Sequence, residues 1–325
     1  MAINLLSIEP TKVSRDLSGY ITYIYGPGGA GKTTFGVATP KPLLLAFEKG
    51  YNALGGVMAQ DITSWSQVKE VLRELKKPDV KAAFSSIIVD TVDIAAQLCE
   101  KYVCSQLGIE NIGDGGWAVN GWAKVKREWE TTFRAITMEG YSLVFISHAK
   151  DKTFTRKDGT SYNQVVPSCS TAYNEIIKNM SDIVGYISIE NGERKLILRS
   201  NDDSVDCKCR FKMIEPEITF SYESLVDALN RAIDAEAAAT NNKYVTNERI
   251  TITTAPVYDY EQLKTDFSTT VGTLMQKNQT LYAPRVSQIV ENILGKGKKF
   301  GDCTIDQVEL MNLIVEEVKA LAANG

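Results

Sequence analysis

A glycine-rich segment near the start of the chain has residue types and a spacing that suit the binding of phosphate groups. Gly26, four further residues and then Gly31-Lys32-Thr33 make the P-loop pattern. Glycines let the backbone curl so that successive N–H groups point toward phosphate oxygens. Lys32 is expected to reach the β- and γ-phosphates, and Thr33 to place its hydroxyl on Mg²⁺. The predicted nucleotide-binding residues are Gly26, Gly28, Gly29, Ala30, Gly31, Lys32, Thr33 and Thr34.

Two acidic residues end apolar runs that follow the P-loop along the chain. Glu48 follows residues 41–47, and Asp90 comes near the end of residues 84–91. Both runs are typical of strands buried on two faces of a parallel sheet, and ligands bind at the carboxyl ends of such strands. Asp90 is predicted to complete the Mg²⁺ site together with Thr33. Glu48 is a candidate base that activates water for attack on the γ-phosphate, or else a solvated charge at a strand end.

The single histidine of the chain stands at the end of a third apolar run. Residues 141–147 form this run and deliver His148 to the sheet edge expected to carry Glu48 and Asp90. A polar side chain there could touch the γ-phosphate and report its presence, or it could be a hydrogen-bonded imidazole at a strand end. The candidate catalytic residues are therefore Lys32, Glu48 and His148.

A polar segment with an Asp158-Gly159 turn follows His148 directly. It interleaves basic and aromatic side chains, a combination that suits the backbone and bases of single-stranded nucleic acid. A solvated hairpin is the alternative. The candidate DNA-binding residues are Lys150, Lys152, Phe154, Arg156, Lys157 and Tyr162.

A second hairpin is predicted around Asn191-Gly192, with strands over residues 184–188 and 195–199. Three basic residues lie on or after it, namely Arg199, Lys208 and Arg210. One of them could reach the γ-phosphate of a neighbouring subunit as a finger, or they are ordinary surface charges.

The strands and helices that must position these residues indicate an α/β fold. Its core is a P-loop NTPase domain over residues 1–235, with a mostly parallel central sheet and an antiparallel hairpin. A change in composition predicts a linker over residues 236–256. Residues 257–325 then form a small helical domain, with helices over 258–276 and 282–294 and a last helix that a capping box at Thr304 opens.

The overall composition is that of an ordinary soluble protein. Apolar residues make up 44% of the chain and charged residues 23%, which is enough for a sizeable core. The net charge of −4 argues against a protein that coats nucleic acid by bulk charge, so any such contact must be local. The first residues lack a signal-peptide pattern and no run approaches a membrane span, so a cytoplasmic protein without membrane contact is expected.

The order of these parts resembles that of the RecA-like recombinase ATPases. The chain looks most like the phage-encoded members of the single-strand annealing group, through residues 24–27, 47–50, 89–93 and 146–150. The resemblance covers roughly the first two-thirds and implies a RecA-like core that binds ATP and Mg²⁺. It also implies that Glu48 activates water and that His148 couples the γ-phosphate to a DNA-holding loop over residues 150–168. The chain departs from RecA in having His148 where glutamine is usual, and in lacking a clear lysine pair for activation in trans.

The leading hypothesis is thus an Mg²⁺-dependent ATPase that binds single-stranded DNA and promotes annealing or homologous recombination. The resemblance implies a ring or filament of identical subunits in the cytoplasm of a bacterial host, with single-strand-binding or other recombination proteins as further partners. One alternative is a helicase loader or branch-migration motor. Another is a nucleotide-gated interaction module with little turnover, whose contacts are made by the C-terminal helices.

Overall fold

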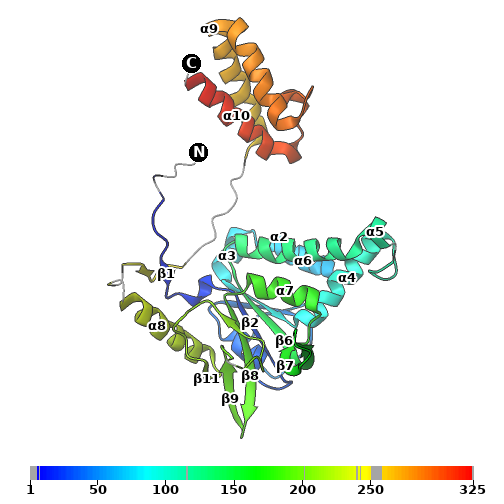
Figure 1. Ribbon diagram of the computed structural model, residues 1–325, viewed down its shortest axis with the longest axis vertical. Coiled ribbons are helices and arrows are strands. Elements are labelled where there is room, and N and C mark those ends of the chain that lie inside the picture. The colour runs from blue at the N-terminus through cyan, green and yellow to red at the C-terminus, as the bar shows by residue number, and fades with distance from the viewer. Residues whose placement is uncertain are drawn as a thin grey trace. The chain divides into compact units, whose positions relative to one another are not determined.

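The chain is divided into two compact units, which are described separately (Figure 1). The larger unit lies within residues 10–254, and residues 255–325 belong to the smaller one. The computed structural model describes residues 6, 8–114, 116–200, 202–238, 241, 243–249 and 258–323, without the side chains of Trp117 and Ala118. The predicted linker, residues 236–256, falls partly outside these residues.

A mostly parallel sheet of ten strands forms the centre of the larger unit within the described residues. Its main path runs β11-β9-β8-β2-β6-β5-β3-β4, while β7 pairs with β6 and β10 pairs with β8. Neighbours from β8 to β4 along this path are parallel, and the remaining pairs are antiparallel. The strands are β2 (Thr22–Gly26), β3 (Pro42–Ala46), β4 (Ala59–Asp61), β5 (Ser86–Asp90), β6 (Ser142–Thr155), β7 (Ser161–Pro167), β8 (Ile183–Glu190), β9 (Glu193–Ile197), β10 (Lys208–Cys209) and β11 (Glu217–Thr219). The expected α/β fold with a mostly parallel sheet and a hairpin at Asn191-Gly192 is therefore confirmed.

Helices cover both faces of this sheet, because successive strand residues point alternately to either side. The helices of the larger unit are α1 (Lys32–Val37), α2 (Trp65–Glu74), α3 (Pro78–Ala83), α4 (Val92–Leu107), α5 (Gly116–Val119), α6 (Gly121–Met138), α7 (Thr171–Met180) and α8 (Tyr222–Ala238), with a 3₁₀ turn at Leu17–Gly19. A separate two-stranded parallel pair joins β1 (Val13–Ser14) to β12 (Val245–Thr246).

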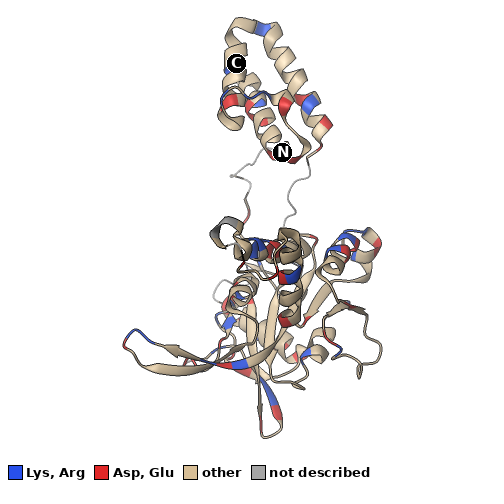
Figure 2. Ribbon diagram, turned by 90° about the vertical axis from the view of Figure 1, so that its right-hand side faces the viewer, with Lys and Arg blue, Asp and Glu red and all other residues tan. Residues whose placement is uncertain are grey.

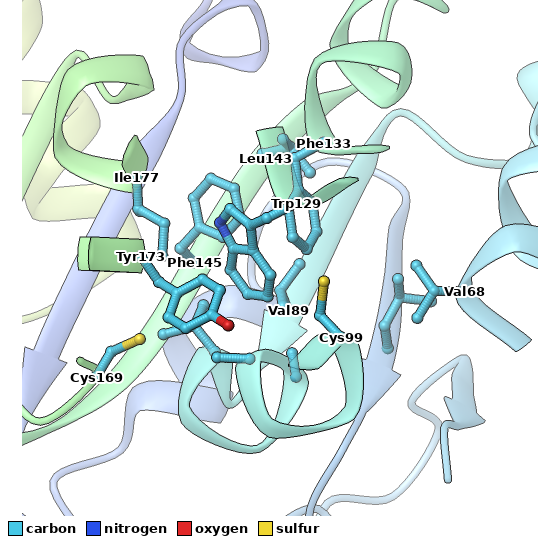
Figure 3. Close-up of a cluster of buried hydrophobic side chains, with 14 of the residues drawn as sticks. Val68, Val89, Cys99, Trp129, Phe133, Leu143, Phe145, Cys169, Tyr173 and Ile177 are labelled. Atoms are coloured by element: carbon cyan, nitrogen blue, oxygen red, sulfur yellow. The ribbon is translucent and has the colours of Figure 1, made fainter. Parts of the chain in front are cut away.

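An aromatic core packs one face of the sheet against α2, α4, α6 and α7. In Figure 3, Trp129 lies among Phe133, Phe145 and Tyr173. Its ring stacks on Trp65 at 5.5 Å between centroids and meets Phe133 edge-on at 4.7 Å. Aromatic pairs in these geometries stabilise a core by roughly 0.5–1.5 kcal/mol beyond the burial of their area. This core holds the strands that bring Asp90 and His148 to the sheet edge.

A second core covers the opposite face of the sheet. Ile24, Ile88 and Ile146, from three neighbouring strands, pack there with Phe35 of α1 and with the apolar side of α8. A methyl group at Gly36 of α1 would lie only 2.9 Å from Ile88, so glycine lets the short P-loop helix lie close against the sheet. The position of α1 fixes the phosphate-binding loop that precedes it.

The smaller unit is helical and has its own core. Its elements are α9 (Tyr260–Leu294), 3₁₀ turns at Phe300–Asp302 and Ile305–Gln307, and α10 (Val308–Ala323). A non-helical residue, Asn278, divides α9 within the interval where two helices were expected. The side chain of Gln307 accepts a hydrogen bond from the Thr304 N–H at 3.0 Å, as a capping box requires.

Candidate nucleotide-binding site

The P-loop follows β2 and leads into α1, which is the strand-loop-helix context that the pattern requires. Gly29 and Gly31 have φ values of +72° and +92°, a region in which side chains other than glycine are strained. Gly26 cannot carry a methyl group without shifting its neighbours, because the methyl would lie 2.9 Å from Ile187 Cβ. These conformations explain why the loop is glycine-rich.

Lys32 lies largely buried inside the curve of this loop. Its Nζ donates hydrogen bonds to the carbonyl oxygens of Gly26 at 3.0 Å and Pro27 at 2.8 Å. Burial lowers the pKa of the ammonium group, and nearby Asp90 and Glu48 oppose that shift. The ammonium is therefore held beside the backbone groups that would surround a phosphate.

Thr33 and Asp90 meet as predicted for a magnesium site. The Thr33 hydroxyl donates to Asp90 Oδ2 at 2.6 Å. Asp90 is only 8% exposed, and burial raises the pKa of its carboxyl group although the Thr33 hydrogen bond opposes this. A hydroxyl and a carboxylate are hard oxygen ligands suited to Mg²⁺, and a divalent cation would offset the cost of burying the charge. The residues present fit the expected metal.

Glu48, just after β3, and His148, within β6, lie together beside these residues. Thr91 Oγ1 donates to Glu48 Oε1, and His148 Nε2 lies 3.5 Å from Glu48 Oε2. His148 stands opposite Gly26 in the parallel register of β6 and β2, which brings it level with the start of the P-loop. A cavity of about 310 Å³ is lined by the P-loop from Gly29 to Thr34 together with Glu48, Asp90, Thr91 and His148. The residues predicted from separate segments thus surround one cavity.

Two residues of this region have contacts that the sequence does not indicate. Thr91 orients Glu48, as described above, and it is also the N-cap of α4. The Asp93 carboxylate accepts hydrogen bonds from Ser147 at 2.8 Å and from Ser168. Ser147 and Ser168 flank the base of the β6–β7 hairpin, and Ser168 N–H donates to the His148 carbonyl at 2.8 Å. No local pattern could have indicated these partners, because they are distant in the sequence.

The comparisons with known proteins agree with this geometry. The model of a family described as an AAA domain matches residues 18–211. The chain is also 32% identical to the SPbeta prophage-derived uncharacterized protein YorG of Bacillus subtilis (strain 168), over 99% of this chain and 100% of that protein. This chain belongs to the AAA-domain family. It is a P-loop NTPase, and its AAA domain extends from before the P-loop strand to beyond the β8–β9 hairpin.

The AAA domain includes the basic segment predicted to hold DNA, which is more regular than expected. The expected strand ends at residue 147, whereas β6 continues to Thr155 and pairs with β7 from Ala149↔Pro167 to Thr155↔Ser161. The polar loop is therefore a long antiparallel hairpin, and Figure 2 shows it extending from the larger unit with a basic tip. Pairing with β7 keeps this polar sequence extended, and the residues of β6 alone do not indicate that pairing.

Most of the predicted DNA-binding side chains share one face of this hairpin. Lys150, Lys152 and Phe154 occupy every second position of β6, Arg156 follows the strand in the same spacing, and Tyr162 stands opposite Phe154. The Phe154 and Tyr162 rings stack at 5.6 Å between centroids, Lys152 Nζ lies 4.8 Å from the Phe154 ring centre, and the Arg156 guanidinium lies 4.3 Å from that of Tyr162. Lys157 belongs to the turn. Arg156 also lies 3.6 Å from Asp203, an exposed pair that contributes little to stability.

The three candidate finger residues lie away from the P-loop of their own AAA domain. β10 pairs with Ile183 and Val184, and these two residues lie beside the first residues of β2. The P-loop follows the last residue of β2, at the opposite end of that strand. Arg199 donates to the Phe211 carbonyl at 2.7 Å, Lys208 to the Ser181 carbonyl at 2.9 Å, and Arg210 pairs with Asp182 at 3.2 Å. A role in a neighbouring subunit remains a prediction.

Among the described residues, no helix is both long and apolar enough to cross a lipid bilayer.

Proposed function

We propose that this protein is a phage-encoded, RecA-like ATPase that binds single-stranded DNA and promotes annealing or homologous recombination. Support for the phage association comes from the prophage-derived relative. Support for the RecA-like assignment comes from the arrangement of P-loop, Glu48, Asp90 and His148 at one sheet edge, followed directly by the basic hairpin.

One observation carries the DNA proposal. The strand β6 passes from His148, which contacts Glu48, straight into a hairpin face that alternates basic and aromatic side chains. Basic groups attract a phosphate backbone, and aromatic rings provide platforms on which bases of any sequence stack. The same strand therefore links the nucleotide cavity to a surface suited to single-stranded DNA.

The residues of the cavity support a division of roles in ATP hydrolysis. Lys32 would bind the phosphates, while Thr33 and Asp90 would hold Mg²⁺, which neutralises phosphate charge when bound. Thr91 and His148 hold the Glu48 carboxylate at the cavity wall, where it can orient a water molecule and accept its proton. When ATP is bound, His148 would contact the terminal phosphate in place of Glu48. This exchange of contacts would move the start of the hairpin, so the hairpin would respond to the bound nucleotide.

Binding to single-stranded DNA tests this proposal. Neutralising Lys152, Arg156 and Lys157 together should weaken binding, because these charges would no longer release counterions from the DNA. The slope of log affinity against log salt should become less negative by roughly 2, since each single-strand phosphate contact contributes about 0.7. Fluorescence anisotropy of a labelled oligonucleotide at several salt concentrations measures both quantities.

A matched control removes the same charge elsewhere. Lys296, Lys298 and Lys299 form a basic turn in the smaller unit, and their triple alanine variant should keep the affinity and slope of the parent. Equal effects of the two triple variants would show a nonspecific charge effect. An unchanged affinity in the hairpin variant would exclude the hairpin as the DNA site.

Assembly and partners follow from the same proposal. We expect identical subunits to form a ring or filament along the DNA, with a basic residue of one subunit acting at the nucleotide of the next. Contacts with single-strand-binding or other recombination proteins belong to this proposal as well.

A further inference from the structure

Arg194 is a cationic side chain beside the P-loop that the roles assigned above do not use. It lies on β9, opposite Ile189 of β8, and its carbonyl accepts a hydrogen bond from the Phe220 N–H at 2.9 Å. Its backbone is thus held from both sides, by the β8–β9 hairpin and by the residue that follows β11. A side chain on a fixed backbone can be placed accurately for ligand binding.

The register of β9 directs Arg194 to the sheet face that carries α1. Leu196, two residues further on, is fully buried in the core shared with α1, and it stands opposite Ile187. Ile187 is the residue packed against Gly26. A methyl group built on Gly31 would lie 3.5 Å from Arg194 Nη1, so the guanidinium lies close to the P-loop.

The Arg194 guanidinium has no hydrogen bond or ion pair to another described residue, and its side chain is exposed. The adjacent Lys195 differs, because it points to the other face of the strand and pairs with Glu217 at 2.9 Å. Guanidinium groups bind phosphate oxygens with two parallel hydrogen bonds. A guanidinium on a fixed backbone, close to a phosphate-binding loop and without a partner among the described residues, is therefore available to a phosphate group.

The strand order shows from which side this contact comes. Glu48 follows β3, Asp90 ends β5 and His148 lies within β6, and these three strands lie on one side of the P-loop strand β2. Arg194 comes from the other side of β2, through β8 and β9. The groups assigned to hydrolysis and Arg194 thus approach the P-loop from opposite sides.

We propose that Arg194 binds the phosphate chain of a nucleotide in its own P-loop, at the end attached to the nucleoside. This inference rests on the proposed nucleotide-binding site. ADP and ATP share the phosphates at that end, so Arg194 would strengthen the binding of both nucleotides equally.

Calorimetric titration with ADP and with a non-hydrolysable ATP analogue, both with Mg²⁺, tests the inference. Arg194→Ala should weaken the affinity for each nucleotide about tenfold, as expected for loss of a hydrogen bond to a charged group. Arg194→Lys should recover part of the loss, because it keeps the charge without the planar fork. Lys195→Ala is the matched control and should bind both nucleotides like the parent.

The outcomes separate this inference from the function on which it rests. An unchanged affinity of Arg194→Ala for ADP, in a protein whose parent binds ADP, would overturn the role of Arg194 alone. A loss confined to the ATP analogue would place Arg194 at the terminal phosphate and overturn its proposed position. A parent protein that binds neither nucleotide would overturn the nucleotide site as a whole. Circular dichroism shows that each variant is folded.

Discussion

The buried carboxylate of Asp90, a candidate Mg²⁺ ligand, has a consequence for the stability of the fold. Burial raises the pKa of this group, so its ionised form is less favourable in the folded chain than in the unfolded chain. An acid with a raised folded pKa stabilises the fold most below its ordinary pKa, and that stability is lost as pH rises through the raised value. At neutral pH the ionised Asp90 therefore destabilises the nucleotide-free protein.

Replacing this carboxyl group should have opposite effects on stability and on binding. Asp90→Asn keeps an oxygen for Thr33 but has no charge, so the free energy of unfolding at pH 7 should rise. The difference from the parent should shrink as pH falls below the ordinary aspartate pKa. Urea denaturation at both pH values measures this, and titration with nucleotide should show weaker Mg²⁺-dependent binding. A less stable Asn variant at pH 7 would show that the buried charge does not destabilise the fold.

At the scale of the elements, the Asp93 contacts connect the nucleotide cavity to the hairpin. Within residues 90–93, Asp90 accepts a hydrogen bond from Thr33 and Thr91 donates one to Glu48. Asp93 accepts hydrogen bonds from Ser147 and Ser168, at the two sides of the hairpin base. Ser168→Ala removes one of these hydrogen bonds and should leave nucleotide affinity unchanged. Stimulation of ATP hydrolysis by single-stranded DNA should fall roughly fivefold, the effect of about 1 kcal/mol.

A serine at the other end of the hairpin provides the control for this prediction. Ser161 lies at the far end of the hairpin, where its hydroxyl is 3.5 Å from that of Thr155. Ser161→Ala should keep the stimulation of the parent protein. If both serine variants respond alike, the hairpin base has no special part in coupling.

The elements predictable from the sequence are those specified by neighbouring residues. The apolar runs that end near Glu48, Asp90 and His148 were recognisable because strands buried on two faces are continuously apolar. The full length of β6 was not, because its polar outer half is held extended by pairing with β7. The short pairing of β1 with β12 was also missed, since Val13 meets Val245 from the other end of the larger unit. The pairing register of β8 and β9 places Arg194 beside Gly31. No local motif indicates that these two residues are neighbours.

At the scale of the whole molecule, each unit has its own apolar core, so each is expected to unfold on its own. Met311 and Leu274 are fully buried in the smaller unit, and Phe267 stacks on Phe300 at 3.9 Å between ring centroids. Met311→Ala should destabilise this unit by about 2–5 kcal/mol, the usual cost of such a cavity. The tryptophans are Trp65, Trp117, Trp122 and Trp129, all in the larger unit.

Two spectroscopic signals therefore separate the units. In Met311→Ala, far-ultraviolet circular dichroism should show an earlier loss of helix on heating, while the midpoint seen by tryptophan fluorescence stays unchanged. Equal shifts of both midpoints would mean that the two units unfold together. The linker over residues 236–256, predicted from a local change in composition, stays a prediction.

The most direct test of the central claim is the rate of ATP hydrolysis with and without single-stranded DNA. The parent protein should hydrolyse ATP in a Mg²⁺-dependent reaction that single-stranded DNA accelerates. Lys32→Ala should lose hydrolysis, and Glu48→Gln should bind ATP without turning it over. Full hydrolysis by Glu48→Gln, or a parent rate that is negligible with and without DNA, would contradict that claim.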